Sequence, residues 1–187
     1  MPTWLERSAR EWIAPASGDA PAGPAAATWT AALGASLVLR ACERALARRA
    51  GSDPDLAAEC EALRTLSARL AAQVDGVEGA LPADDAEAHR KAARTFLAAC
   101  DACFSVLDVT ERAVSAVGSD EVADLWAGSG LAAAAAEALA IRVRESMARA
   151  EDETLARPEK NRLVAALHEA RRARERILAA VESRMVL

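Results

Sequence analysis

The chain has few of the residues that favour β-strands. Aromatic residues make up only 3% of its 187 positions, and alanine, leucine, glutamate and arginine dominate the rest. These dominant residues favour helices, so the composition excludes a β-rich fold and predicts an all-α one. The length is enough for one domain with a real core, and we expect residues 1–187 to form a single helical domain.

The chain also lacks a surplus of basic residues. Its formal net charge is −5, and Lys91 and Lys160 are its only lysines. Proteins that bind nucleic acids usually present clustered positive charge to the phosphate backbone. We therefore expect no nucleic-acid partner.

No apolar run is long enough to cross a bilayer. The opening residues, MPTWLERSAR, lack the apolar centre of a signal peptide. The most apolar run, at 25–39, is shorter than the roughly 20 residues that a membrane span needs. These features predict a cytoplasmic protein without a membrane partner.

The chain has four cysteines, Cys42, Cys60, Cys100 and Cys103. The last two have the C-x2-C spacing of many zinc sites, but the first two do not, and His89 and His168 lie far away in the sequence. Reduced cysteine is a common small core residue in helices, so a core role is favoured over a metal site or a disulfide. We expect no metal, and we expect His89, in EAHRKAAR, to be solvated.

Helix caps and helix breakers divide the chain into about six helices. They are expected at about 3–13, 24–50, 54–74, 86–117, 120–157 and 159–185. The second begins at Pro24 or Thr28 and ends before Gly51, and Asp53 caps the third. We expect Gly128–Gly130 to break the fifth helix after a short segment, and Pro158 to separate it from the sixth.

Two segments are apolar on every side, 28–39 and 131–141. Such helices belong at the centre of a bundle. A chain this small has difficulty covering two of them, and a homo-oligomer that shares them is a natural solution. We therefore expect an antiparallel helical bundle that forms a homodimer.

The same two regions resemble motifs of a folate enzyme family. PAGPAAATWTAALGASL (21–37) aligns without gaps with a P-G-G-G-S loop and the alanine-rich helix that follows it. ADLWAGSGLAAAAAEALAIRVRES (123–146) aligns with a helix that runs from an aspartate to two asparagines. With the order and length of the helices, these segments resemble the cyclodeaminase/cyclohydrolase family, the helical half of formiminotransferase-cyclodeaminase and its stand-alone bacterial relatives.

Several motif positions differ from the family pattern. The loop retains Pro21 and Gly23 but loses its serine, and the two asparagines correspond to Arg142 and Ser146. The family's K-L-P-K segment corresponds to ALPA at 80–83, without either lysine. Among the polar motif positions only Asp124 is retained. The chain resembles a diverged member, so folate activity does not carry over directly.

The resemblance implies that Asp124 is the catalytic residue. The family's reactions act at a C–N bond of a folate one-carbon unit and need proton transfer at nitrogen beside a cationic amidine-like carbon. A carboxylate in a partly apolar pocket suits both tasks, and Asp124 lies between Val122 and the apolar pair Leu125 and Trp126. The alternative is that Asp124 only caps or decorates the segment before Gly128.

The residues expected to bind the substrate are Pro21, Gly23, Pro24, Ala25, Thr28, Trp126, Arg142 and Ser146. Arg142 and Ser146 lie one turn apart on one helix face, where the arginine would grip a carboxylate or pair with Asp124. The loop 21–25 would present backbone N–H groups at a helix start. The alternatives are a solvated Arg142 and a tryptophan that belongs to the core or an interface.

The leading functional hypothesis is a small-molecule enzyme of the cyclodeaminase/cyclohydrolase type. It would act at a C–N bond of a folate or of another imine- or amidine-bearing compound, with a tetrahydrofolate derivative as substrate and no separate cofactor. The first alternative is a catalytically silent helical dimer that binds a ligand or partner. The second is a repurposed biosynthetic enzyme that uses the same cleft for new chemistry.

Overall fold

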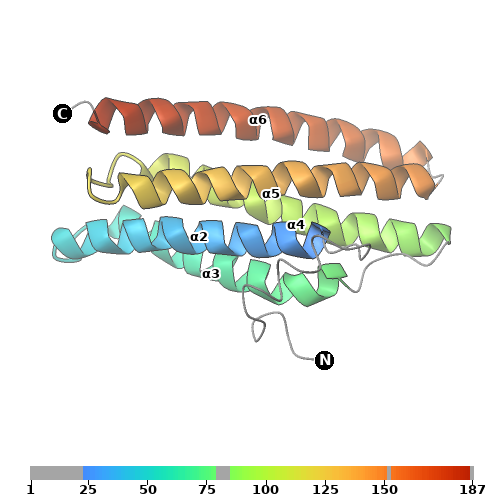
Figure 1. The fold of residues 1–187 in the computed structure, drawn as a ribbon, viewed down its shortest axis with the longest axis horizontal. Coiled ribbons are helices and arrows are strands. Elements are labelled where there is room, and N and C mark those ends of the chain that lie inside the picture. The colour runs from blue at the N-terminus through green and yellow to red at the C-terminus, as the bar shows by residue number, and fades with distance from the viewer. Residues whose placement is uncertain (1–22, 79–84, 151–152, 186–187) are drawn as a thin grey trace.

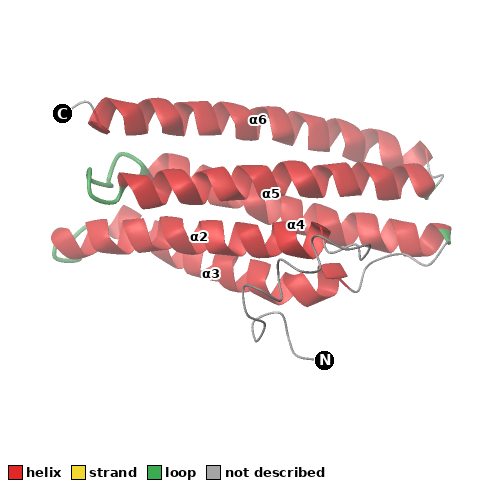
Figure 2. Cartoon of the chain, in the orientation of Figure 1, coloured by secondary structure: helices red, strands yellow, loops and turns green. Residues whose placement is uncertain are grey.

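The chain folds into long helices that lie side by side (Figure 1; Figure 2). The computed structural model describes residues 23–78, 85–150 and 153–185, and within these ranges it has five helices and no strand. They are α2 (Gly23–Arg48), α3 (Pro54–Glu78), α4 (Ala86–Ala113), α5 (Val122–Arg149) and α6 (Glu153–Met185). The all-α prediction is confirmed. The helix count differs from six, because the helix expected at 3–13 lies outside the described residues.

Two predicted helix boundaries are confirmed by their hydrogen bonds. Asp53 accepts a hydrogen bond from the Leu56 N–H at 3.0 Å and so caps α3. Gly51 has a φ of +72° and its N–H donates to the Leu46 carbonyl at 3.0 Å, which ends α2. A left-handed backbone at this position costs glycine no steric strain.

The predicted break at Gly128–Gly130 is wrong, because α5 runs through it without interruption. The glycine at 128 serves a close helix crossing. A Cβ placed on Gly34 of α2 would lie 2.6 Å from the Gly128 carbonyl oxygen, and one on Gly128 would lie 2.5 Å from the Gly34 carbonyl oxygen. The two backbones therefore touch at a distance that only glycine on both sides allows.

Three other predicted boundaries also differ. Pro158 does not separate two helices, since α6 begins at Glu153 and contains it. The fourth helix ends at Ala113 rather than 117, because arginines bind the carbonyls beyond that point: Arg184 donates to those of Ser115 and Val117, and Arg49 to that of Ala116. The start of α5 is Val122, and its N-cap residue, Glu121, makes no side-chain capping bond.

The four cysteines are buried in the helical core, as predicted. Burial raises the pKa of the Cys42 and Cys100 thiols to about 12. The Cys100 Sγ donates to the Ala136 carbonyl of α5 at 3.4 Å. These thiols contribute apolar packing between helices.

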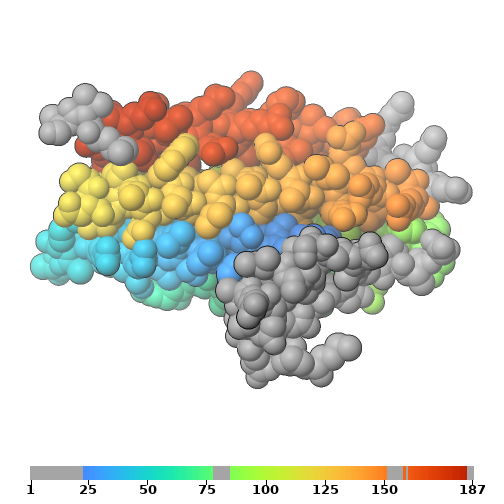
Figure 3. All heavy atoms as spheres, in the orientation of Figure 1, coloured from blue at the N-terminus to red at the C-terminus, as the bar shows by residue number. Residues whose placement is uncertain are grey.

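Helices α2 and α5 run antiparallel and in contact along one face of the molecule (Figure 3). Both are partly buried, α2 against α3 and α5, and α5 against α2, α4 and α6. Each also keeps an exposed strip, since Leu33 is 40% exposed and Ile141 57% exposed. Helix α2 is long and apolar enough to cross a membrane, but the core helices of globular proteins often are as well. Half of its most apolar 18-residue stretch is buried in the bundle.

Candidate functional site

Asp124 lies in the first turn of α5 and faces α2. Its Oδ2 accepts a hydrogen bond from Arg40 Nε at 2.9 Å, and its Oδ1 accepts one from Arg40 Nη2 at 2.6 Å. This two-point contact raises the pKa of the Arg40 guanidinium. Asp124 is therefore the partner of an arginine, and Glu121 rather than Asp124 occupies the N-cap position of α5.

A second ion pair lies one turn away and was not anticipated from the sequence. Arg48 of α2 pairs with Glu121, whose side chain is almost fully buried. The second oxygen of this carboxylate, Oε2, has no hydrogen-bond partner among the described residues. Arg40 and Arg48, eight residues apart on α2, thus meet acids three residues apart at the start of α5. The two ion pairs together hold this end of α2 against the start of α5.

Arg142 and Ser146 lie toward the other end of α5. Arg142 donates to Glu145 at 2.8 Å, and Ser146 is buried. A Cβ on Gly23, at the start of α2, would lie 3.6 Å from Arg142 Nη2. The structure thus brings together Arg142 and the first residue of α2, two members of the expected substrate-binding set.

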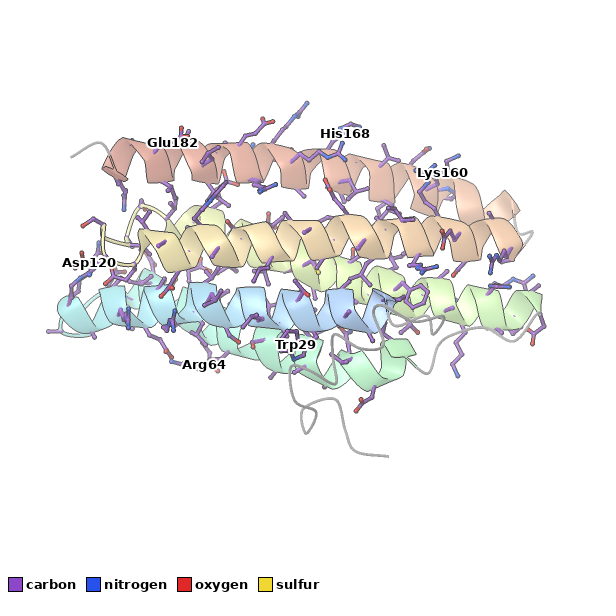
Figure 4. All side chains as sticks on the ribbon, in the orientation of Figure 1. Trp29, Arg64, Asp120, Lys160, His168 and Glu182 are labelled. Carbon is purple, nitrogen blue, oxygen red and sulfur yellow. The ribbon has the colours of Figure 1, made fainter. Side chains whose placement is uncertain are left out.

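A groove with a volume of about 500 Å³ lies beside Arg142, between α5 and α6. It is lined by Ile141, Arg144, Glu145, Met147, Ala148 and Lys160. Figure 4 shows Lys160 and Asp120 toward opposite ends of the molecule. The groove is therefore far from the start of α5, where Asp124 lies.

Within one subunit, Asp124 does not lie in one cleft with Arg142 and Ser146. Arg142 follows Asp124 by 18 residues on one continuous helix, which places them about 27 Å apart at roughly 1.5 Å per residue. The expected pairing of Arg142 with Asp124 is likewise not seen, because Arg142 bonds Glu145 and Asp124 bonds Arg40. Because the expected break at Gly128–Gly130 is absent, α5 has no bend there that could bring its two ends together.

The remaining predicted residues have structural contacts of their own. Pro24 and Ala25 are buried in the first turn of α2, and the buried Thr28 hydroxyl donates to the Pro24 carbonyl at 2.8 Å. Arg174 of α6 stacks 5.4 Å from the centre of the Trp126 ring, so one face of that ring is covered. Pro21 and the segment 80–83 lie outside the described residues.

His89 was expected to be solvated, and this is wrong. Its side chain is 5% exposed, and its Nδ1 has no hydrogen-bond partner among the described residues. The spacing of His89 with Ala92, Ala93 and Phe96, all buried on α4, is the signal that predicts this burial.

Comparison with solved structures identifies the fold. The chain matches the crystal structure of formiminotetrahydrofolate cyclodeaminase from Thermotoga maritima with a TM-score of 0.82, over 98% of this chain and 99% of that one. The two sequences are 14% identical. No family model matches the chain, and no curated protein sequence does. The chain therefore has the cyclodeaminase fold along its whole length.

Proposed function

We propose that the protein is a small-molecule enzyme that acts at the C–N bond of an imine- or amidine-bearing compound, such as a folate one-carbon unit. The observation that carries this proposal is the end-to-end fold match with a formiminotetrahydrofolate cyclodeaminase. The carboxylate of Asp124 would stabilise the cationic carbon and move the proton. We further propose that this carboxylate reaches its substrate in a site shared between two subunits.

The face formed by α2 and α5 supports such a dimer. Its middle is apolar and made of small or aliphatic side chains, namely Leu33, Leu37, Ala127, Leu131, Ala134, Ala138 and Ile141. Among these, Leu33 and Ile141 are two of the large hydrophobic residues that remain exposed. An exposed apolar strip along two adjacent helices is typical of a surface that a second copy covers.

The spacing of two charged residues on α5 is compatible with a twofold dimer. On α5, Asp124 and Arg142 lie at equal distances on either side of Ala133. A twofold axis that runs beside the exposed face of α5, at the level of Ala133 along the helix, would place Asp124 of one subunit at the level of Arg142 of the partner subunit. It would thereby build from two chains the cleft that one chain does not form, with the start of the partner's α2 at its edge.

The first prediction concerns this dimer. Light scattering of the purified protein at micromolar concentration should give a molar mass of about twice the 19.6 kDa of one chain. We expect the dimer interface to bury more than about 2,000 Å² of surface in total. Ala134→Arg should yield a folded monomer, because it puts a charge near the proposed axis. Ala165→Arg, at an exposed position on α6, is the matched control and should stay dimeric. A monomeric wild-type protein would contradict the proposed site.

The second prediction concerns folate. A thermal-shift screen with tetrahydrofolates, followed by an assay for the loss of methenyl-tetrahydrofolate absorbance, should show weak or no cyclohydrolase activity. The chain lacks the loop serine and both lysines, which would grip the anionic tail and polarise the one-carbon unit. Turnover as fast as that of a family member with all of these residues would contradict the expectation of a diverged substrate.

One observation favours a second candidate function, a catalytically silent dimer that binds a ligand or a partner. Arg40 already contacts both oxygens of Asp124, as in a structural ion pair. In that case the C–N chemistry would be absent, while the dimer and its surface would remain. A repurposed enzyme, in contrast, would use Asp124 on a different substrate.

A further inference from the structure

Arg40, Arg44 and Arg48 lie at successive turns of α2, and Arg44 is the one whose guanidinium N–H groups are free to bind a ligand. Arg40 contacts Asp124 and Arg48 contacts Glu121, whereas Arg44 Nη1 lies 3.9 Å from Asp124 Oδ2, beyond hydrogen-bond distance. Its side chain is 59% exposed. No hydrogen bond joins it to another described residue. The guanidinium therefore presents its N–H groups to solvent directly beside the Asp124 carboxylate.

Asp124 also retains capacity for a ligand. A carboxylate has about four lone-pair sites, and Arg40 occupies one on each oxygen. The Asp124 side chain is 22% exposed, so a small cationic group can reach it. The side chain can thus accept a hydrogen bond from a ligand while it stays paired with Arg40.

The two groups together select for a molecule with both charges. A guanidinium binds a carboxylate through two parallel hydrogen bonds, and a carboxylate attracts a protonated imine or amidine. A purely anionic ligand would pair with Arg44 but gain nothing from Asp124, and a purely cationic one would pair with Asp124 but be repelled by Arg44 and Arg40. The start of α5, which has no side-chain cap, adds further positive potential beside the anionic group of the ligand.

We propose that Arg44 binds a carboxylate of the substrate while Asp124 faces its cationic C–N group, so that the substrate is a small amino-acid-like molecule bearing an imine or amidine. This inference rests on the proposed function and narrows its substrate class. The 3.9 Å separation of the two side chains means that the two charges of the ligand lie within a few bonds of each other. Arg44 is a specificity-determining residue in this arrangement.

The test uses guanidinoacetate, which carries a carboxylate one carbon away from a guanidinium. Methylguanidine lacks its carboxylate, and acetate lacks its cation. NMR titration of the full-length protein should show guanidinoacetate binding at least about tenfold more tightly than either fragment. Arg44→Gln should reduce its affinity to that of methylguanidine, and Arg44→Lys should restore part of the preference.

Arg171→Gln is the matched control, since Arg171 is an exposed arginine on α6 that pairs with Glu137. This variant should prefer guanidinoacetate over the two fragments as strongly as the wild-type protein does. A wild-type protein with no preference for guanidinoacetate, or an Arg44→Gln variant that keeps it, would overturn the inference. The proposed function and this inference can fail independently. If guanidinoacetate is preferred and the preference depends on Arg44, but no C–N turnover is found, the inference stands and the proposed function fails. If the protein turns over a substrate without a carboxylate and the turnover depends on Asp124, the proposed function stands and the inference fails.

Discussion

Asp124→Asn is expected to lower the rate of C–N chemistry by about 10²–10⁴-fold while the fold and the dimer persist. Asparagine keeps the size of the side chain and one oxygen that can accept from Arg40. It has neither the negative charge that stabilises a cationic carbon nor a site for the transferred proton. The rate is measured on the substrate found in the ligand screen, and the fold is checked by a thermal melt of the same samples.

Arg40→Gln is the matched variant for this comparison. It breaks the same ion pair but leaves the Asp124 carboxylate in place. If Asp124 is only the structural partner of Arg40, the two variants should lose the same small amount of stability and have the same rate. A much larger loss of rate for Asp124→Asn than for Arg40→Gln is the result that a catalytic carboxylate requires.

Gly128→Ala is expected to lower the free energy of unfolding by about 2–3 kcal/mol. The added Cβ would lie 2.5 Å from the Gly34 carbonyl oxygen and 2.7 Å from Val38 Cγ2. The first of these contacts is with backbone, which cannot rotate away, so α2 and α5 must move apart and lose packing along their crossing. Urea denaturation measures the loss.

Gly130→Ala, two residues further along the same helix, is the control. A Cβ there would have one neighbour within 4 Å, the end of the flexible Arg174 side chain at 3.9 Å. Alanine favours a helix over glycine by up to about 1 kcal/mol, so this variant should be as stable as the wild type or more so. If both variants had the same stability, the close crossing of α2 and α5 would be contradicted.

The sequence predicts those parts of the fold that depend on local contacts. Asp53 caps α3 through the N–H of Leu56, three residues away, and Gly51 ends α2 through its own backbone conformation. The burial of His89 was also readable, since His89, Ala92, Ala93 and Phe96 share one face of α4. Its position in the first turn suggested exposure, and that local cue was misleading.

Contacts between distant residues account for the parts that the sequence does not predict. A glycine within an apolar run either interrupts a helix or permits a close crossing, and the outcome at Gly128 depends on Gly34 in another helix. The carboxylate of Asp124 meets Arg40, 84 residues away in sequence. The alignment of 123–146 located Asp124 but carried no information about which helix would lie beside it.

Mixing two variants tests most directly whether subunits share a site that contains Asp124. Asp124→Asn and Arg142→Gln each inactivate both sites of their own dimer if the site combines Asp124 of one subunit with Arg142 of the partner subunit. After unfolding and refolding together at equal concentration, half of the dimers should be mixed, and each of these has one intact site. The account predicts that the mixture recovers about a quarter of the wild-type rate. A mixture no more active than the two variants alone would contradict it.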